Sequence, residues 1–362
     1  MDERWQVARR ILVIRLDNLG DVLLATPAIR AIRRALPRAR IVLLASPAGA
    51  QVAGLNPDLD DVIVYRAPWM DPDRVLPQDP SREHAVIAAL RRQGFDGAII
   101  FTSYHQSALP AAYLCYLAGI PLRHAASVDG PGSLLTSRHV HPPRPLHEVE
   151  RGLDLVAGLG IPPYGSDLVL VPRPSDREAM MELVEPLRRD GRPVIAIHAG
   201  CSCPSRTIPP AQLAAIADAL SRELGAEIIW TGTAHEVGLI EGIRAGLARP
   251  GRSVAGQTDL SRLAALLAAC DVALTANTGP MHVAAAVKTP VAVLFALTNP
   301  PHAWHPWGVP FRLLNRSVPC AICYQRVCPR QQECLREVTT AEVVEAIAAL
   351  LEARKTSRGG LP

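Results

Sequence analysis

The stretch Ala276-Asn277-Thr278-Gly279-Pro280-Met281-His282 decides how the second half of this chain folds. It follows the apolar run 271–275 and precedes a helical pattern over 280–287, which predicts a strand, a tight turn of small residues and a helix start. Backbone N–H groups and the positive end of the helix dipole meet at such a turn, so the place suits a phosphate group. A nucleotide diphosphate is therefore the first ligand to expect. A well-capped helix start without a ligand is the alternative interpretation.

A second turn of this kind lies near the N-terminus. The apolar run 11–14 leads into Arg15-Leu16-Asp17-Asn18-Leu19-Gly20-Asp21, and an amphipathic helix over 22–36 follows, ended by Pro37. Asp21 stands at the predicted helix start, where a carboxylate is favoured as a cap. Each half of the chain thus carries one strand–turn–helix with polar side chains.

Size and composition limit the class of protein. The 362 residues suffice for two domains with cores, and 49% hydrophobic residues indicate a globular chain. No apolar run approaches the roughly 18 residues that cross a bilayer, and the N-terminus lacks a signal-peptide pattern, so a cytoplasmic location is expected. The net charge of +4 is modest and no nucleic-acid motif occurs, which argues against a nucleic-acid partner.

Basic residues gather in the first forty positions: Arg4, Arg9, Arg10, Arg30, Arg33, Arg34, Arg38 and Arg40. A solvated helix face explains them. A surface that meets an acidic or membrane-embedded acceptor is the second interpretation, and it implies peripheral contact with a membrane.

Strand-like and helix-like runs alternate, which predicts an α/β fold with mostly parallel sheets. In the first half strands are expected at 11–15, 41–45, 62–65 and 98–102, and helices at 22–36, 83–93, 108–118 and 147–159. In the second half strands are expected at 193–198, 226–231, 252–255, 271–275 and 290–295, with helices at 210–224, 235–247, 259–269, 280–287 and 340–353. Segments 66–82 and 121–146 are predicted to be irregular. A linker over 172–176 divides the chain into domains 1–172 and 173–362.

These motifs together resemble the heptosyltransferase-like glycosyltransferases of family 9. The resemblance rests on the N-terminal stretch 15–23 with Thr26-Pro27-Ala28, on His198-Ala199-Gly200, Arg206-Thr207-Ile208-Pro209, Thr231-Gly232-Thr233-Ala234-His235-Glu236 and Ala255-Gly256-Gln257-Thr258-Asp259-Leu260, and most strongly on the stretch 277–284. It implies a GT-B architecture, two Rossmann-like domains facing a central cleft. It also implies an inverting, metal-independent transfer of a sugar, commonly from ADP-heptose, to a lipid-linked core oligosaccharide or related glycan.

The resemblance assigns roles to particular residues. Asp21 is the candidate base facing the sugar, with Asp17 and Gly20 beside it on the acceptor side, and Arg206 neutralises the leaving diphosphate. The donor-binding set is Gly200, Arg206, Glu236, Asn277, Thr278, Gly279, Pro280, Met281 and His282. Backbone N–H groups of Thr278, Gly279 and Met281 are expected on the diphosphate, while Glu236 is expected on a ribose hydroxyl.

Two positions depart from the family pattern, and several assignments have a structural alternative. Asn277 replaces an Asp that the family often has next to the donor sugar, which leaves the sugar open, and Arg206 replaces a Lys without loss of charge. The alternatives are a helix cap for Asp21, a solvated loop acid for Asp17, a surface arginine for Arg206, a packed core side chain for His282 and a helix-start carboxylate for Glu236.

Four cysteines near the C-terminus, Cys320, Cys323, Cys328 and Cys334, have the spacing C-x2-C-x4-C-x5-C. Four thiolates suit zinc or an iron–sulfur cluster, but metal-free structural thiols are the preferred interpretation, and no cofactor is expected. Cys115 and Cys270 are expected in the core, and Cys201 and Cys203 in a loop near the donor site.

Three other function classes compete with the family assignment. One is another GT-B enzyme, with a different nucleotide-sugar donor or an epimerase activity. A second is a non-catalytic two-domain sugar-binding protein of periplasmic type. A NAD-dependent dehydrogenase is disfavoured because neither turn has the spacing G-x-G-x-x-G.

Overall fold

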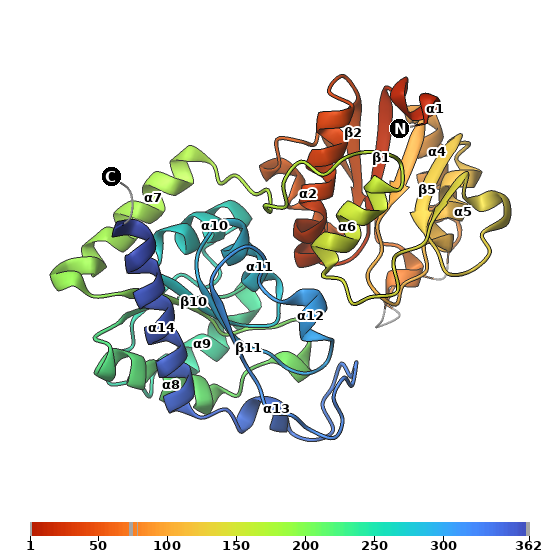
Figure 1. Ribbon diagram of the computed structural model, residues 1–362. Coiled ribbons are helices and arrows are strands. Elements are labelled where there is room, and N and C mark those ends of the chain that lie inside the picture. Colours follow the sequence, from red (N-terminus) through yellow and green to blue (C-terminus); the bar gives the residue numbers. More distant parts are fainter. Residues whose placement is uncertain (1, 72–74, 78, 360–362) are drawn as a thin grey trace. The chain divides into compact units, whose positions relative to one another are not determined.

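The chain folds into two units, residues 1–169 and 170–362, in a computed structural model that describes residues 2–71, 75–77 and 79–359. Each unit is built on a six-stranded parallel sheet with helices (Figure 1). The division falls beside the boundary that the sequence predicts at 172 and 173. The two units are described separately below.

The first unit has the strand order β3-β2-β1-β4-β5-β6, and every neighbouring pair is parallel. The strands are β1 (Arg10–Arg15), β2 (Arg40–Ala45), β3 (Asp61–Val64), β4 (Gly97–Ile100), β5 (Leu122–Ala126) and β6 (Ser137–His139). The helices are α1 (Glu3–Gln6), α2 (Leu19–Ala35), α3 (Pro47–Ala50), α4 (Ser81–Gln93), α5 (Leu109–Leu117) and α6 (Glu148–Ala157), with short 3-10 turns η1 (Ala53–Leu55), η2 (Pro68–Met70) and η3 (Gly132–Leu134).

Helix α2 connects the central strand β1 to β2 and packs beside α6 (Figure 1). Pro27 inside α2 lacks the N–H that would bond the carbonyl of Leu23. The hydroxyl of Thr26 donates to that carbonyl at 2.6 Å and accepts from the N–H of Val169 at 2.9 Å. The proline is therefore tolerated, and the same hydroxyl ties the end of the unit to α2.

The second unit has the order β12-β11-β10-β7-β8-β9, which repeats the topology of the first, again with parallel pairs. The strands are β7 (Val194–His198), β8 (Glu227–Thr231), β9 (Arg252–Ser253), β10 (Val272–Ala276), β11 (Val291–Leu294) and β12 (Phe311–Leu314). The helices are α7 (Pro174–Val184), α8 (Pro210–Glu223), α9 (Val237–Arg244), α10 (Leu260–Ala269), α11 (Gly279–Ala286), α12 (Pro301–Trp304), α13 (Glu333–Arg336) and α14 (Thr340–Gly359), with 3-10 turns η4 (Glu185–Gly191), η5 (Pro204–Arg206) and η6 (Ala234–Glu236).

Two expectations from the sequence are wrong, and one strand was not expected. Segment 121–146 is not irregular, because it contains β5 and β6. The expected linker 172–176 contains the start of α7, with Pro174 in its first turn, where the missing N–H costs nothing. Strand β12 was not expected; it adds to the edge of the sheet beside β11.

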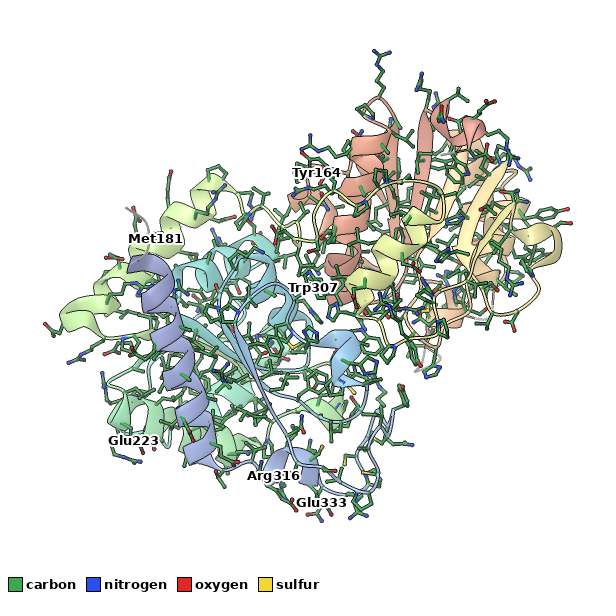
Figure 2. The ribbon with its side chains drawn as sticks, viewed as in Figure 1. Tyr164, Met181, Glu223, Trp307, Arg316 and Glu333 are labelled. Carbon is green, nitrogen blue, oxygen red and sulfur yellow. The ribbon has the colours of Figure 1, made fainter. Side chains whose placement is uncertain are left out.

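Several of the basic N-terminal side chains have acidic partners inside the first unit. Four of the eight form ion pairs with aspartates: Arg4 with Asp2, Arg30 with Asp58, Arg33 with Asp60 and Arg40 with Asp61. Arg34 lies 4.6 Å above the ring of Tyr164 beside α2 (Figure 2). These contacts favour the interpretation as a solvated structural face. Among the described residues, no helix combines the length and the apolar content needed to span a membrane.

The first unit depends on a close approach between Trp5 and β4. Trp5 is 1% exposed, and a Cβ on Gly97 would lie 2.6 Å from its ring. We expect Gly97→Ala to lower the free energy of unfolding by about 1–3 kcal/mol because a packed indole cannot move aside. Gly54→Ala is the control, since no atom lies within 4 Å of its added Cβ. Urea denaturation of both variants checks this, and equal stability would contradict it.

Candidate functional site

The switch point of the first sheet lies between β1 and β4, since the chain winds from β1 toward β3 on one side and from β4 toward β6 on the other. The loops after these two strands diverge there, and open parallel sheets bind ligands in the crevice that results. Asp17 and Asp21 follow β1, and Thr102 and Ser103 follow β4. The predicted acceptor-side residues therefore stand at the switch point.

A buried guanidinium, that of Arg15, draws three carboxylates together at this point. Its Nε lies 2.7 Å from Asp17 Oδ2, and its Nη2 lies 3.3 Å from Asp21 Oδ1 and 3.1 Å from Glu148 Oε2. Arg151 approaches the other oxygen of Glu148 at 3.2 Å. We call these five side chains the Arg15 cluster.

The pKa values in the Arg15 cluster follow from burial and mutual attraction. Burial alone would lower the pKa of Arg15, but Asp17, Glu148 and Asp21 raise it above its ordinary value. Burial raises the pKa of Asp17 and of Glu148, and the neighbouring arginines oppose that rise. Arg15 therefore stays charged, and its carboxylate partners hold that charge in the interior.

The structure corrects the interpretation of both aspartates. Helix α2 begins at Leu19 with Asn18 as its N-cap, so Asp21 is the third helical residue and not the cap. Its carboxylate instead meets Arg15 and accepts from the hydroxyl of Ser103 at 3.4 Å, with 17% of the side chain exposed.

Asp17 is not a solvated loop acid. It is 7% exposed and accepts a hydrogen bond from Gln106 in addition to its ion pair. Gly20 is buried in the first turn of α2 and contributes backbone only.

Two cavities open beside the Arg15 cluster. The smaller, lined by Arg15, Asp21, His141, Glu148 and Arg151 among others, has about 10 Å³ available, which suits a single water. The larger, of about 320 Å³, is lined by Asp17, Trp69, Met70, His105 and Gln106 among others. Ile100, Phe101 and Thr102 line both, so the cavities adjoin. The larger one has the size of a small-molecule site.

The second sheet has its switch point between β7 and β10. Arg206 ends the 3-10 turn η5 after β7, and its guanidinium donates from Nε to Thr298 Oγ1 at 2.9 Å and from Nη1 to the carbonyl of Asn277 at 3.3 Å. No carboxylate pairs with Arg206 in the part of the chain that the structure describes. A half-buried cation held only by neutral groups is suited to an anionic ligand.

Asn277 does not present its side chain as the sequence suggested. Its Nδ2 donates to the carbonyl of Ala296 at 3.1 Å and to Asn299 Oδ1 at 3.0 Å, and its Oδ1 accepts from the N–H of Ala296 at 3.0 Å. The side chain is 3% exposed and fastens the end of β10 to the segment after β11. These bonds give Asn277 a structural role at the site.

The turn before α11 narrows the set of predicted backbone donors. The N–H of Thr278 bonds the carbonyl of Ala276, and the N–H of Met281 bonds the carbonyl of Thr278. Gly279 is the one of the three without a backbone partner among the described residues. Thr278, Gly279 and Pro280 are half-buried and accessible, whereas Met281 and His282 are buried.

Gly200 and Glu236 approach closely at the ends of β7 and β8. A Cβ on Gly200 would lie 1.7 Å from Glu236 Oε1, so a larger residue would displace that carboxylate. Glu236 Oε2 accepts from the N–H of Thr233 at 2.7 Å in a capping box. Glu236 Oε2 therefore caps a helix start, as one interpretation of the sequence expects. Glu236 Oε1 lies against Gly200, which follows β7 at the switch point of the sheet.

The cysteine-rich segment supports the loops that carry Arg206 and Thr298. Backbone N–H groups of Cys323 and Tyr324 bond the carbonyls of Leu297 and Thr298, and Ser205 bonds the carbonyls of Gln325 and Arg326. All eight cysteines are free thiols. Within the described residues no three of the four clustered sulfurs converge as metal ligands do, although their mutual influence adds to burial in raising the pKa of Cys334.

Sequence reasoning missed Arg15, Ser103, Glu148 and Thr298 as site residues. Arg15 had a visible signal, since this arginine directly follows the apolar run 11–14. Glu148 had none, because 133 residues separate it from Arg15 and only the fold brings the two together.

The end of β7 carries a histidine that burial keeps neutral. Burial lowers the pKa of His198 to about 4, although Glu236 opposes this. Between pH 6.5 and 4 the unfolded chain binds a proton that the folded chain does not, so stability falls as the pH drops through this window. We expect the free energy of unfolding of the wild type to fall by on the order of 3 kcal/mol across this pH window, and we expect this fall to be largely absent in His198→Gln.

Chemical denaturation between pH 7 and pH 4 measures the effect. His302→Gln, which removes an exposed histidine of α12, should retain the wild-type pH dependence. A pH dependence in His198→Gln as steep as that of the wild type would contradict the assignment.

Comparison with known proteins points to one family. The model of glycosyltransferase family 9 (heptosyltransferase) matches residues 83–333. Lipopolysaccharide heptosyltransferase 2 of Escherichia coli K12 is 26% identical over 306 residues, 80% of this chain and 84% of that protein. A match to lipooligosaccharide heptosyltransferase 2 of Campylobacter jejuni, also 26% identical, spans 28% of this chain and about a third (32%) of that relative.

The fold is that of a solved heptosyltransferase. The structure of Escherichia coli ADP-heptose lps heptosyltransferase II superposes with a TM-score of 0.73 at 22% identity, covering 96% of this chain and 99% of that one. The expected GT-B architecture of two Rossmann-like domains is confirmed. By this fold and by the family match over more than half its length, the chain belongs to glycosyltransferase family 9 (heptosyltransferase).

Proposed function

We infer that the chain transfers a heptose from an ADP-linked donor to a lipid-linked glycan acceptor of the lipopolysaccharide core type. The observation that carries this is Arg206, a half-buried guanidinium without an acidic partner among the described residues, beside the strand–turn–helix at 276–282. The names of the relatives above supply the sugar, the nucleotide and the acceptor class. Family membership supports the reaction type.

The donor half of the reaction uses the second unit. When the bond between the anomeric carbon and the diphosphate breaks, its electron pair stays on the diphosphate oxygen. Arg206 stabilises that growing charge, with the N–H of Gly279 and the dipole of α11 as further electrostatic support. Thr298 and the carbonyl of Asn277 hold the guanidinium in place. These groups supply the charge stabilisation for which other transferases use a metal ion, and we propose that transfer requires no metal.

The acceptor half uses the first unit. An acceptor hydroxyl attacks the anomeric carbon from the face opposite the diphosphate, its proton passes to Asp21, and the sugar configuration inverts. Arg15 orients Asp21 at the switch point, because its Nη2 lies 3.3 Å from Asp21 Oδ1. The hydroxyl becomes acidic as it bonds to the cation-like sugar, so a positioned carboxylate can take its proton late in the step.

The larger of the two cavities beside the Arg15 cluster is the proposed acceptor site. It offers the apolar surfaces of Trp69, Met70 and Phe101 together with the polar side chains of Asp17 and Gln106. Sugar rings pack their apolar faces on aromatic and thioether groups and bond their hydroxyls to carboxylates and amides. The lipid-linked acceptor implies work at the cytoplasmic face of the inner membrane.

Asp21→Asn keeps the shape of the side chain and removes its ability to take a proton. We expect turnover to fall by a factor on the order of 10²–10⁴ while donor affinity stays near that of the wild type. Turnover, the dissociation constant of the donor and the melting temperature are measured together. Asp61→Asn is the control, because Asp61 is an exposed, ion-paired acid of the same unit. Turnover within a few-fold of the wild type would remove Asp21 from the mechanism.

Arg206→Gln removes the proposed diphosphate cation. Loss of a charged hydrogen bond of about 1.5–3 kcal/mol should weaken ADP binding by about 10- to 100-fold in calorimetry. Arg222→Gln, at an exposed ion-paired arginine of α8, should bind ADP normally.

ADP binding and turnover should both survive a chelator, because the proposed transfer requires no metal. Unchanged affinity in a folded Arg206→Gln, or turnover that a chelator abolishes and magnesium restores, would contradict this part of the proposal.

A further inference from the structure

A second polar cluster lies in the first unit, outside the proposed reaction. His139 ends β6, and His141 lies two residues further along the chain. Asp154 faces them from α6, with its Oδ2 2.6 Å from His139 Nε2 and 2.7 Å from His141 Nδ1. Among the described residues, these are the three side chains of metal-binding type whose ligand atoms all lie within 4.8 Å of one another.

The fold holds these three side chains in place. The ring of His139 occupies the space that a Cβ on Gly158 would fill, since that atom would lie 2.6 Å from His139 Nδ1. The rings of His139 and His141 meet edge to face, with their centroids 5.0 Å apart. The side chains of His139, His141 and Asp154 are 16%, 14% and 31% exposed, so the cluster is positioned yet reachable from solvent.

We propose that His139, His141 and Asp154 bind a divalent transition-metal ion of the zinc class. Two imidazoles and one carboxylate form a donor set that such ions prefer, and three protein ligands leave one or more positions for water or a substrate group. The ion would be coordinated by Nε2 of His139, Nδ1 of His141 and Oδ2 of Asp154.

The geometry requires only a small adjustment. Tetrahedral coordination at zinc–nitrogen and zinc–oxygen lengths near 2.0–2.2 Å separates ligand atoms by about 3.3 Å. The two observed separations from Asp154 Oδ2 must therefore open by about 0.6–0.7 Å, which small rotations of the three side chains provide. The hydrogen bonds now made to Asp154 hold the same three atoms together in the absence of an ion.

The charges around the cluster are compatible with a cation. Arg151 lies one turn before Asp154 on α6, but Glu148 pairs with it at 3.2 Å. The Arg15 cluster and Asp154 together hold two arginines and four carboxylates, an excess of acid. The neighbouring His124 is not a ligand, because Ser137 and the carbonyl of Leu155 take its two ring nitrogens.

An ion at this site would fasten the segment after β6 to α6. The first residue of α6 is Glu148, which holds Arg15, and His141 lines the small cavity that Asp21 also lines. The metal thus stiffens the support of the acceptor side, in a different unit from the diphosphate groups. Transfer itself requires no metal in the proposed function, so the two proposals fail independently.

Cobalt(II) titrated into the full chain tests the site, since its visible bands report coordination. Thiolate ligands add strong near-ultraviolet charge transfer, which separates binding at the cysteines from binding at histidines. We expect visible bands without thiolate charge transfer, saturating at one ion per chain. Loss of one ligand in His141→Ala or in Asp154→Asn should weaken cobalt binding by at least about 100-fold. Even mutation of a residue that only hydrogen-bonds a metal ligand typically lowers metal affinity by about 10- to 100-fold.

The control is His84→Ala, an exposed histidine of α4 in the same unit, which should bind cobalt as the wild type does. Zinc should raise the melting temperature of the wild type and of His84→Ala, and not that of Asp154→Asn. Because Asp154→Asn retains the shape of the side chain, it keeps the test valid even if His141→Ala fails to fold. Absence of visible cobalt bands in the wild type, or bands that persist unchanged in Asp154→Asn, would overturn the proposal.

Discussion

In each unit the candidate site residues depend on where a parallel sheet changes its winding direction. In each unit the first strand lies inside the sheet, so the loops after the first and fourth strands separate and leave a crevice between them. Arg15 leads into that crevice in the first unit, and Gly200 and Asn277 border it in the second. The two units use the same topology to present opposite charges, carboxylates in one and an arginine in the other.

The two arginines show how burial and pairing decide the role of a cation. Arg15 is fully buried and surrounded by acids, and removal of one partner of such a set costs about 3–5 kcal/mol because a charge is left uncompensated. Such a group positions its neighbours and takes no ligand. Arg206 is half-buried and held by a hydroxyl and a carbonyl, with no carboxylate partner among the described residues, which suits it to an anionic ligand. Asp21 stands between these extremes, fixed by Arg15 yet partly exposed.

The sequence predicted the two parallel sheets because most of their strands are continuous apolar runs joined to amphipathic helices. It missed β5 and β6 because Arg123 and His124 are buried in polar contacts inside β5, and because β6 has no apolar residue. Local motifs singled out Asp21, Arg206 and the turn at 277–282, which the structure places after strands that border the switch points. They did not reveal that Asp17 is buried, that Asn277 bonds backbone, or that Glu148 completes the Arg15 cluster. Each of these depends on a partner distant in the chain, which no local pattern records.

The central claim is that this chain performs a single-displacement glycosyl transfer. The most direct measurement incubates the full chain with ADP-heptose and a heptose-accepting core oligosaccharide, then determines ADP release, product mass and anomeric configuration. The account predicts one ADP released for each acceptor that gains one heptose, with the configuration inverted relative to the donor. ADP release without a heavier acceptor, or retention of configuration, would contradict it.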